Sequence, residues 1–182
     1  MTPRLKQRYD KEICTELMKR FGFKNKLAVP RLRKITVNMG VGDASSDQQI
    51  LDTAMAEVAA ITGQKPKVTR AKRSISSFKV RAGQPVGCVA TLRGARMYEF
   101  MDRLLNIAIP RVRDFRGVSP DSFDRGGNFT LGIQEQTIFP EVGYDSILRV
   151  RGLNVTFVFQ NSASTEVNRE LLRAFGMPFK TA

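Results

Sequence analysis

The stretch from Lys34 to Val41 constrains the fold more than any other part of the chain, because its side chains alternate between apolar and small or polar. The apolar positions are Ile35, Val37, Met39 and Val41, and the intervening positions are Thr36, Asn38 and Gly40. Successive side chains of a β-strand point to opposite faces of a sheet. The pattern therefore predicts a strand with one buried face, and its polar face is free if helices cover only the other side.

Helical and strand periodicities are mixed along the rest of the chain. Apolar residues at helical spacing predict helices over residues 4–20, 46–62, 96–109 and 164–175. Alternation predicts further strands near Val68 and over residues 87–93, 129–133 and 153–159. This mixed order indicates an α+β fold, and a length of 182 residues suits a single domain over residues 1–182.

Two blocks of the sequence carry the excess positive charge. The chain has 30 Lys and Arg against 17 Asp and Glu, a formal net charge of +13. Residues 1–36 hold eleven cations and three anions, residues 64–96 hold nine cations and no anion, and residues 97–182 hold ten of each. A charge of this size favours a polyanion partner, and we expect nucleic acid rather than a membrane because no strongly apolar helix accompanies it.

Residues 70–83 form a long basic loop without sustained periodicity. Lysines and arginines alternate here with three serines and Phe78, and the segment contains no acidic residue. Long loops in compact domains tend to be functional or disordered. The cations offer phosphate contacts and Phe78 offers a stacking surface, so we favour RNA contact over a flexible solvated hairpin. DNA stays open at this point, because phosphate contacts do not report on the sugar.

Catalytic and metal-binding functions find little support. The chain has no histidine, which removes Ser–His and Cys–His pairs and histidine metal sites. Cys14 and Cys88 have no metal-ligand or disulfide spacing, so we expect reduced core thiols. The Gly40–Gly42 segment is better explained as a tight turn than as a phosphate-binding loop. A loose group of acids is expected to serve loop solvation and capping rather than metal binding: Asp121, Asp124, Glu135, Glu141 and Asp145.

The termini and hydropathy point to the cytoplasm. The first 20 residues are charged along their length and lack the apolar core of a signal peptide. No stretch approaches the roughly 18 apolar residues that a membrane span requires. We therefore expect a cytoplasmic protein that is not an enzyme, needs no cofactor or metal, and has no membrane partner.

Nine short strings follow one another from residue 30 to the end of the chain. They are PRLRKITVNMGVG (30–42), ITGQKP (61–66), PVGC (85–88), TLRG (91–94), MYEF (97–100), PRVRDFRG (110–117), NFTLGI (128–133), IFPE (138–141) and GMPF (176–179). Together they resemble the fifth large-subunit ribosomal protein family, the bacterial 5S rRNA binder. The resemblance spans essentially the whole chain, and so many ordered strings make it far more specific than any one motif.

The resemblance implies an antiparallel sheet with helices packed on one face and the other face free for a loop of 5S rRNA. Asn38, Gln64 and Thr91 match family positions at that RNA surface. Strand alternation independently places Asn38 and Thr91 on the polar side. The neighbouring cations complete the expected 5S rRNA-binding set: Arg33, Lys34, Lys65 and Arg93.

The resemblance also implies further partners. It places the protruding loop 70–83 near P-site tRNA, with these candidate contacts: Arg70, Lys72, Arg73, Ser74, Ser77, Phe78, Lys79 and Arg81. It directs the region around residues 110–145 to a small-subunit head protein as part of an intersubunit bridge. It adds 23S rRNA and other 5S-associated large-subunit proteins as neighbours.

Two rival hypotheses use the same residues differently. A free-standing RNA chaperone or architectural nucleic-acid binder needs only the charge, and it predicts similar affinity for unrelated RNA or DNA. An enzyme acting on nucleic acid through Mg²⁺ held by the carboxylate-rich loop predicts metal-dependent turnover that Asp121→Asn or Asp124→Asn abolishes.

Overall fold

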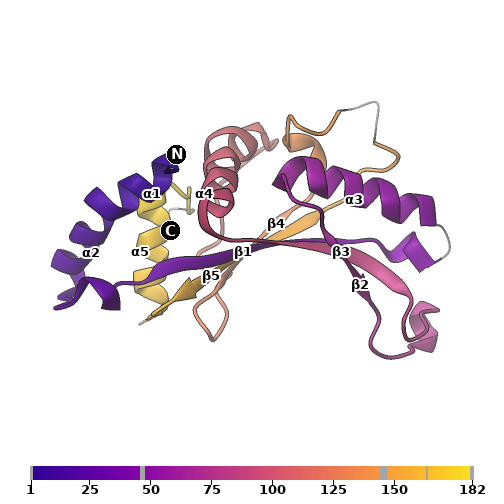
Figure 1. Ribbon diagram of the computed structural model, residues 1–182, viewed down its shortest axis with the longest axis horizontal. Coiled ribbons are helices and arrows are strands. Elements are labelled where there is room, and N and C mark those ends of the chain that lie inside the picture. Colours follow the sequence, from indigo (N-terminus) through magenta and orange to yellow (C-terminus); the bar gives the residue numbers. More distant parts are fainter. Residues whose placement is uncertain (1, 46–47, 144–146, 163, 181–182) are drawn as a thin grey trace. The chain divides into compact units, whose positions relative to one another are not determined.

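A computed structural model describes residues 2–45, 48–143, 147–162 and 164–180 (Figure 1). The chain forms five strands and five α-helices within these ranges, which confirms the α+β prediction. It divides into two compact units. Unit 1 comprises residues 1–35, 93–131 and 156–182, and unit 2 comprises residues 36–92 and 132–155. Each unit is assembled from separate stretches of chain, and a single domain over residues 1–182 remains our proposal.

The five strands form one antiparallel sheet in the order β2-β3-β1-β5-β4. Their bounds are Arg31–Gly40 for β1, Lys67–Arg70 for β2, Pro85–Leu92 for β3, Phe129–Ile133 for β4 and Leu153–Gln160 for β5. Each predicted strand is present. Strand β1 begins three residues earlier than predicted, because the exposed cations Arg31 and Arg33 hide the strand from the alternation pattern.

Unit 1 contains four helices around an apolar core. Helix α1 (Arg4–Arg8) continues through a π-helical turn (Tyr9–Ile13) into α2 (Cys14–Phe21), as predicted for residues 4–20. Helix α4 (Gly94–Arg103) continues into a second π-helical turn at Leu104–Ala108. Helix α5 (Thr165–Phe175) begins after Ser164, whose hydroxyl accepts a hydrogen bond from the Val167 amide (3.4 Å) and so caps the helix.

The helix that begins at Gly94 ends close to Pro110, which the helical spacing over residues 96–109 predicts as its stop. The π-helical turn ends at Ala108, and Pro110 lies in the short 3₁₀ turn Ile109–Arg111 that follows. Proline is tolerated in the first turn of a helix, where its missing N–H has no partner to lose. The chain leaves helical geometry only at Val112.

Unit 2 packs a single helix against its strands. Helix α3 (Gln48–Thr62) lies along one side of β1 and β3, and Gly63 ends it in the left-handed conformation with φ +67° (Figure 1). The spacing of Ser46 and Gln49 predicts Ser46 as the N-cap of this helix and Asp47 as a favourable first-turn charge, and both residues lie outside the described ranges. The core of the unit includes Val37, Met39, Cys88, Ala90 and Leu92, all buried. Their strand neighbours are half-exposed, as the alternation predicted: Thr36, Asn38, Val89 and Thr91.

Candidate RNA-binding surface

The polar positions of three neighbouring strands form the helix-free face of unit 2, which we call the open face. It consists of Thr36 and Asn38 on β1, Lys67 and Thr69 on β2, and Val89 and Thr91 on β3. Lys67 pairs with Val89, and Thr69 pairs with Gly87. Directly paired residues of antiparallel strands share a face. The open face therefore presents a cation and small polar groups around one valine.

Two of the predicted RNA-binding residues have unsatisfied side chains on this face. Asn38 and Thr91 are half-exposed, and neither side chain makes a hydrogen bond to any other residue within the described ranges. An amide and a hydroxyl in this state have donors and acceptors available for an external ligand. Polar, uncharged groups of this kind suit recognition of RNA bases and 2′-hydroxyls.

Gln64 is held next to Thr91 at the edge of the open face. Its side-chain amide donates a hydrogen bond to the Thr91 carbonyl (3.3 Å). The Thr62 hydroxyl fixes the turn by donating to the Val58 carbonyl (2.7 Å) and accepting from the Gln64 amide (3.3 Å). Gln64 is thereby oriented by its own backbone as well as by β3, and the exposed Lys65 follows it. The structure thus brings together Gln64 and Thr91, which are 27 residues apart.

A glycine allows β3 to pass very close to β1 beneath the open face. A Cβ atom at Gly87 would lie 2.4 Å from the Met39 carbonyl oxygen and 3.3 Å from the Thr69 hydroxyl oxygen. The first distance is far below van der Waals contact, so the close approach of the two strands requires glycine. The motif containing Gly87 was predicted only through the family resemblance.

The other predicted 5S rRNA-binding cations belong to unit 1. Arg33 and Arg93 are exposed, and Lys34 is half-buried. Unit 2 contains Asn38, Gln64, Lys65 and Thr91 of the predicted set, and the RNA-binding role of all seven residues stays a prediction.

The segment predicted as an unpatterned loop is closed by backbone hydrogen bonds. The Ile75 amide donates to the Val80 carbonyl (2.8 Å), and the Val80 amide donates to the Ile75 carbonyl (3.2 Å). The Ser74 hydroxyl accepts a hydrogen bond from the Ala82 amide (3.0 Å), and the Arg70 guanidinium donates to the Gly83 carbonyl (2.9 Å). We call residues 70–83 the tip. Ser74 and Arg70 thus help to close the tip.

The remaining candidates on the tip point to solvent. Phe78 is 75% exposed and Ile75 is 46% exposed. The exposed candidate side chains are Lys72, Arg73, Ser77, Lys79 and Arg81, and none forms an ion pair within the described ranges. Exposed apolar groups beside unpaired cations are typical of a surface that contacts another molecule.

A network between α3 and residues 147–151 was not predicted from the sequence. The buried Gln136 side chain donates to the Arg149 carbonyl (2.8 Å) and accepts from the Arg151 amide, and it also contacts Glu57. Asp43 accepts from the Arg149 guanidinium (2.6 Å). Burial raises the pKa of Glu57, against the opposing effects of the Arg151 charge and of the Gln136 hydrogen bond.

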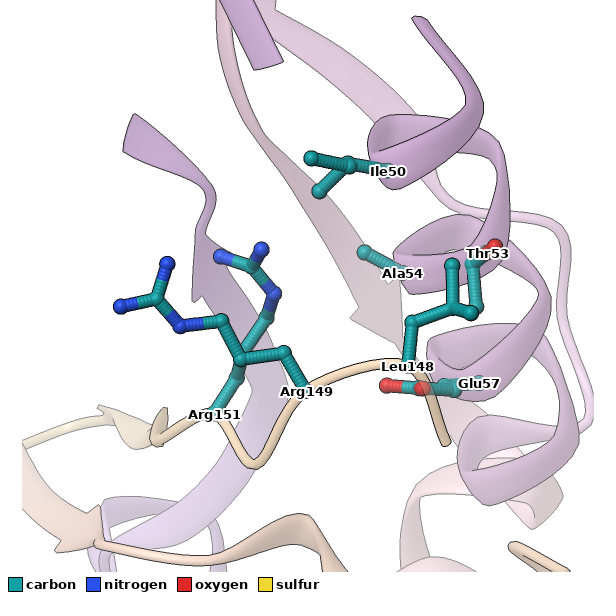
Figure 2. A pocket seen from close by; sticks show the side chains of 7 residues that line it. All are labelled: Ile50, Thr53, Ala54, Glu57, Leu148, Arg149 and Arg151. Atoms are coloured by element: carbon teal, nitrogen blue, oxygen red, sulfur yellow. The ribbon is translucent and has the colours of Figure 1, made fainter. Parts of the chain in front are cut away.

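A pocket lies over this network (Figure 2). It is lined by Ile50, Thr53, Ala54, Glu57, Leu148, Arg149 and Arg151. Figure 2 shows the Glu57 carboxylate beside Leu148, while the Arg149 and Arg151 side chains extend away from it. The helical spacing of Ile50 with Ala54 predicts a core position for Ile50, but it is half-buried because it lines this pocket. We interpret the network as structural, since Gln136 links residues 149–151 to Glu57 on α3 within unit 2.

The acidic residues do not gather into a metal site in the part of the chain that the structure describes. Asp124 instead caps a turn: its carboxylate accepts from the Asn128 amide (2.7 Å) and from the Asn128 side chain (2.9 Å). The side-chain hydrogen bond from Asn128 is the main cause that lowers the pKa of Asp124. Asp145 lies outside the described residues. Cys14 and Cys88 are free and buried, and burial raises the pKa of Cys88 to about 11.

These features define a basic α+β sheet protein with an open polar strand face and without a recognisable catalytic centre among its described residues. None of the helices in those residues combines the length and apolarity needed to cross a bilayer.

Comparison with known proteins identifies the family. The model of "Ribosomal protein L5" matches residues 25–81, and that of the "ribosomal L5P family C-terminus" matches residues 85–179. Proteins named "Large ribosomal subunit protein uL5" are similar over nearly their whole length. One from Anaeromyxobacter sp. (strain K) is 56% identical over 180 residues (99% of each chain), and one from Clostridium acetobutylicum is 55% identical over 179 residues (98% of this chain, 99% of the relative). A third, from Rubrobacter xylanophilus, is 57% identical over 177 residues (97% and 98%).

The chain therefore belongs to the ribosomal protein L5 family, as the ordered strings predicted. Its relatives are named as ribosomal proteins, which form a structural family, and this confirms the prediction that the chain is not an enzyme.

Proposed function

We propose that the chain is a structural constituent of the large ribosomal subunit in the cytoplasm, where it binds 5S rRNA through the open face of unit 2. In this role it helps to attach 5S rRNA to the central protuberance. Its neighbours there are 23S rRNA and other 5S-associated large-subunit proteins. Family membership supports the ribosomal setting, and the open face supports the choice of surface.

The unsatisfied side chains of Asn38 and Thr91 carry this proposal. A half-exposed amide and hydroxyl on a rigid strand face keep their positions without using their hydrogen-bonding capacity. Gln64 is fixed beside them by its hydrogen bond to the Thr91 carbonyl. The flanking Lys65 and Lys67 add attraction to phosphate, so specificity and affinity come from different side chains.

Removing the two polar groups tests the proposal. We expect Asn38→Ala combined with Thr91→Ala to weaken 5S rRNA binding roughly 30-fold, from about 1 kcal/mol for each lost hydrogen bond. The free energy of unfolding should change by less than about 0.5 kcal/mol, because neither side chain is in the core. Filter binding and urea unfolding measure the two quantities.

A matched control removes the same groups elsewhere. Thr15→Ala combined with Asn106→Ala deletes one hydroxyl and one amide from exposed helical positions of unit 1, and 5S rRNA binding should be unchanged. Unfolding of the Asn38/Thr91 variant would show that these residues belong to the core. Equal affinity of the unaltered chain for 5S rRNA and an unrelated RNA would favour the rival chaperone hypothesis.

We further propose that the tip contacts P-site tRNA. Its exposed Phe78 is suited to stacking on an unpaired base or ribose, and the surrounding Lys and Arg side chains are free to bind phosphate. Ser74 is engaged with the Ala82 amide, so it supports the shape of the tip. Both predicted serines are exposed, and the Ser77 hydroxyl makes no hydrogen bond within the described residues.

The contact with the small-subunit head belongs, in our proposal, to unit 2. The region around residues 110–145 is divided between the two units at Leu131. In unit 2 its continuation at residues 147–151 exposes Leu148 (70%) and Val150 (54%) beside the Asp43-bound Arg149. Exposed apolar side chains held in a fixed segment suit a protein partner better than RNA.

A further inference from the structure

The charge of the chain is concentrated in the unit that does not contain the open face. Unit 1 holds 21 cations against 10 anions, whereas unit 2 holds 9 against 7. The open face and the tip proposed above both lie in unit 2. Most of the net charge therefore has no role in either proposal.

One segment of unit 1 concentrates arginine around an exposed aromatic ring. Residues 111–116, which we call the arginine loop, contain Arg111, Arg113 and Arg116 together with Phe115. All three arginines are exposed, and Phe115 is 36% exposed although it is a large apolar residue. The only acid in the loop is Asp114.

The arginine loop is anchored at both ends, so its side chains project from a defined backbone. Ile109 before it and Val118 after it are buried. The Val118 amide donates to the Pro178 carbonyl (2.8 Å), and the Lys180 amide donates to the Val118 carbonyl (3.0 Å). Asp114 has a positive φ of 49°, which sharply turns the chain between Arg113 and Phe115.

The second anchor brings a fourth cation to the arginine loop. Gly117 has φ +88°, and a Cβ atom there would lie 2.9 Å from the Lys180 amide nitrogen. The Lys180 backbone therefore lies directly beside Gly117, at the end of the loop, and the Lys180 side chain is exposed. Three arginines and one lysine, with a single acid, leave a local net charge of +3.

The arginines of the loop have no partner among the described residues, whereas three other arginines of unit 1 form ion pairs. Arg4, Arg8 and Arg173 form ion pairs with Asp102, Glu12 and Glu170. Arg111, Arg113 and Arg116 form no ion pair or side-chain hydrogen bond with any residue that the structure describes. Even Asp114, their sequence neighbour, is not paired with them. Their guanidinium groups are thus free for an external anion.

We infer that the arginine loop is a second RNA-binding site, separate from the open face. Guanidinium groups bind phosphate with two parallel hydrogen bonds, and both guanidinium and phenyl planes stack on unpaired bases. A segment of RNA with an unstacked base, such as an internal or terminal loop, satisfies both the charge and Phe115. A protein partner is disfavoured, because four cations would need several carboxylates and Phe115 is the one exposed apolar side chain of the segment.

Neutralising the arginines tests the charge component. The probe is a fluorescent single-stranded uridine 12-mer, titrated with the full chain at several salt concentrations. Arg111→Gln, Arg113→Gln and Arg116→Gln together should reduce the log–log salt slope by roughly 2, since each phosphate contact on a single strand contributes about 0.7. The control, Arg4→Gln, Arg8→Gln and Arg173→Gln, removes the same charge from paired arginines and should leave the slope nearly unchanged.

Replacing the ring tests the stacking component. Phe115→Leu should weaken binding of the uridine 12-mer roughly tenfold with no change in salt slope, because one stacked base is lost. Heparin, a polyanion without bases, should bind the Phe115→Leu variant as well as the unaltered chain. Equal slope losses in both arginine sets, or equal effects of Phe115→Leu on the two ligands, would overturn the inference.

The test separates this site from the open-face proposal. Arg111→Gln, Arg113→Gln and Arg116→Gln together should reduce the log–log salt slope by the same amount when Asn38→Ala and Thr91→Ala are also present, since the two surfaces share no residue. If the open-face variant keeps full 5S rRNA affinity while the arginine-loop effect persists, the proposed function fails and the second site stands. If the arginine-loop effect disappears in that background, the second site is not independent and the inference fails.

Discussion

Gly87 lies where β3 passes close to β1 beneath the open face, and the absence of a side chain makes this close approach possible. A methyl group at this position would lie 2.4 Å from the Met39 carbonyl oxygen, which is backbone and cannot rotate away. We expect Gly87→Ala to lower the free energy of unfolding by roughly 2–3 kcal/mol, within the range seen for overpacked cores. The urea unfolding midpoint of the variant measures this.

Gly132 on β4 provides the control for that change. A Cβ atom there meets only the Asn154 side chain, at an ordinary 3.6 Å. Gly132→Ala should therefore be neutral or stabilise the fold by up to about 1 kcal/mol, because alanine restricts the unfolded chain. Equal destabilisation by both substitutions would show that the Gly87 contact is not the cause.

Single residues were predictable from sequence where a local period decides their environment. Alternation placed Asn38 and Thr91 on the open face and Val37 and Met39 in the core, because a strand has only two sides. It could not predict Gln136, whose buried amide contacts residues up to 79 positions away. Such contacts depend on tertiary placement, for which the sequence carries no local signal.

Elements were predicted best where both a periodic core and an end signal are present. The strand over residues 129–133 has the predicted bounds, and α5 starts directly after its Ser164 cap. The sequence did not predict that the tip is a structured element, because backbone hydrogen bonds between Ile75 and Val80 close it. Its side chains are exposed and charged, so they show no buried period from which a hairpin can be recognised.

The tip should therefore tolerate changes that abolish its contacts. Ile75→Ser combined with Phe78→Ser is expected to change the free energy of unfolding by less than about 0.5 kcal/mol, because both side chains are exposed and the backbone bridge remains. Loss of stacking should accelerate dissociation of P-site tRNA from ribosomes carrying the variant by up to roughly tenfold. Pulse–chase release of labelled tRNA measures this rate.

Leu27 offers the matched control for the tip, since it is 74% exposed but belongs to unit 1. Leu27→Ser removes a similar exposed apolar group and should leave tRNA dissociation unchanged. A tip variant that unfolds, or one that releases tRNA at the normal rate, would contradict the role proposed for Phe78.

At the scale of the whole molecule, the two units have different charge and offer different RNA contacts. Unit 2 combines a nearly balanced charge with unsatisfied polar groups, which favours specific recognition. Unit 1 combines a large excess of cations with unpaired arginines, which favours phosphate binding. A chain built in this way should bind RNA with specificity from one unit and much of its electrostatic affinity from the other.

The salt dependence of 5S rRNA binding reports on that division. If the whole chain neutralises roughly 6–8 phosphates, affinity should fall by about three to four orders of magnitude between 50 and 200 mM salt, because each contact releases counterions. The Asn38/Thr91 variant should show the same slope at lower affinity, since it removes no charge. A nearly flat salt dependence of the unaltered chain would show that its cations are not at the RNA, and a changed slope in the uncharged variant would show that the open face also positions the phosphates.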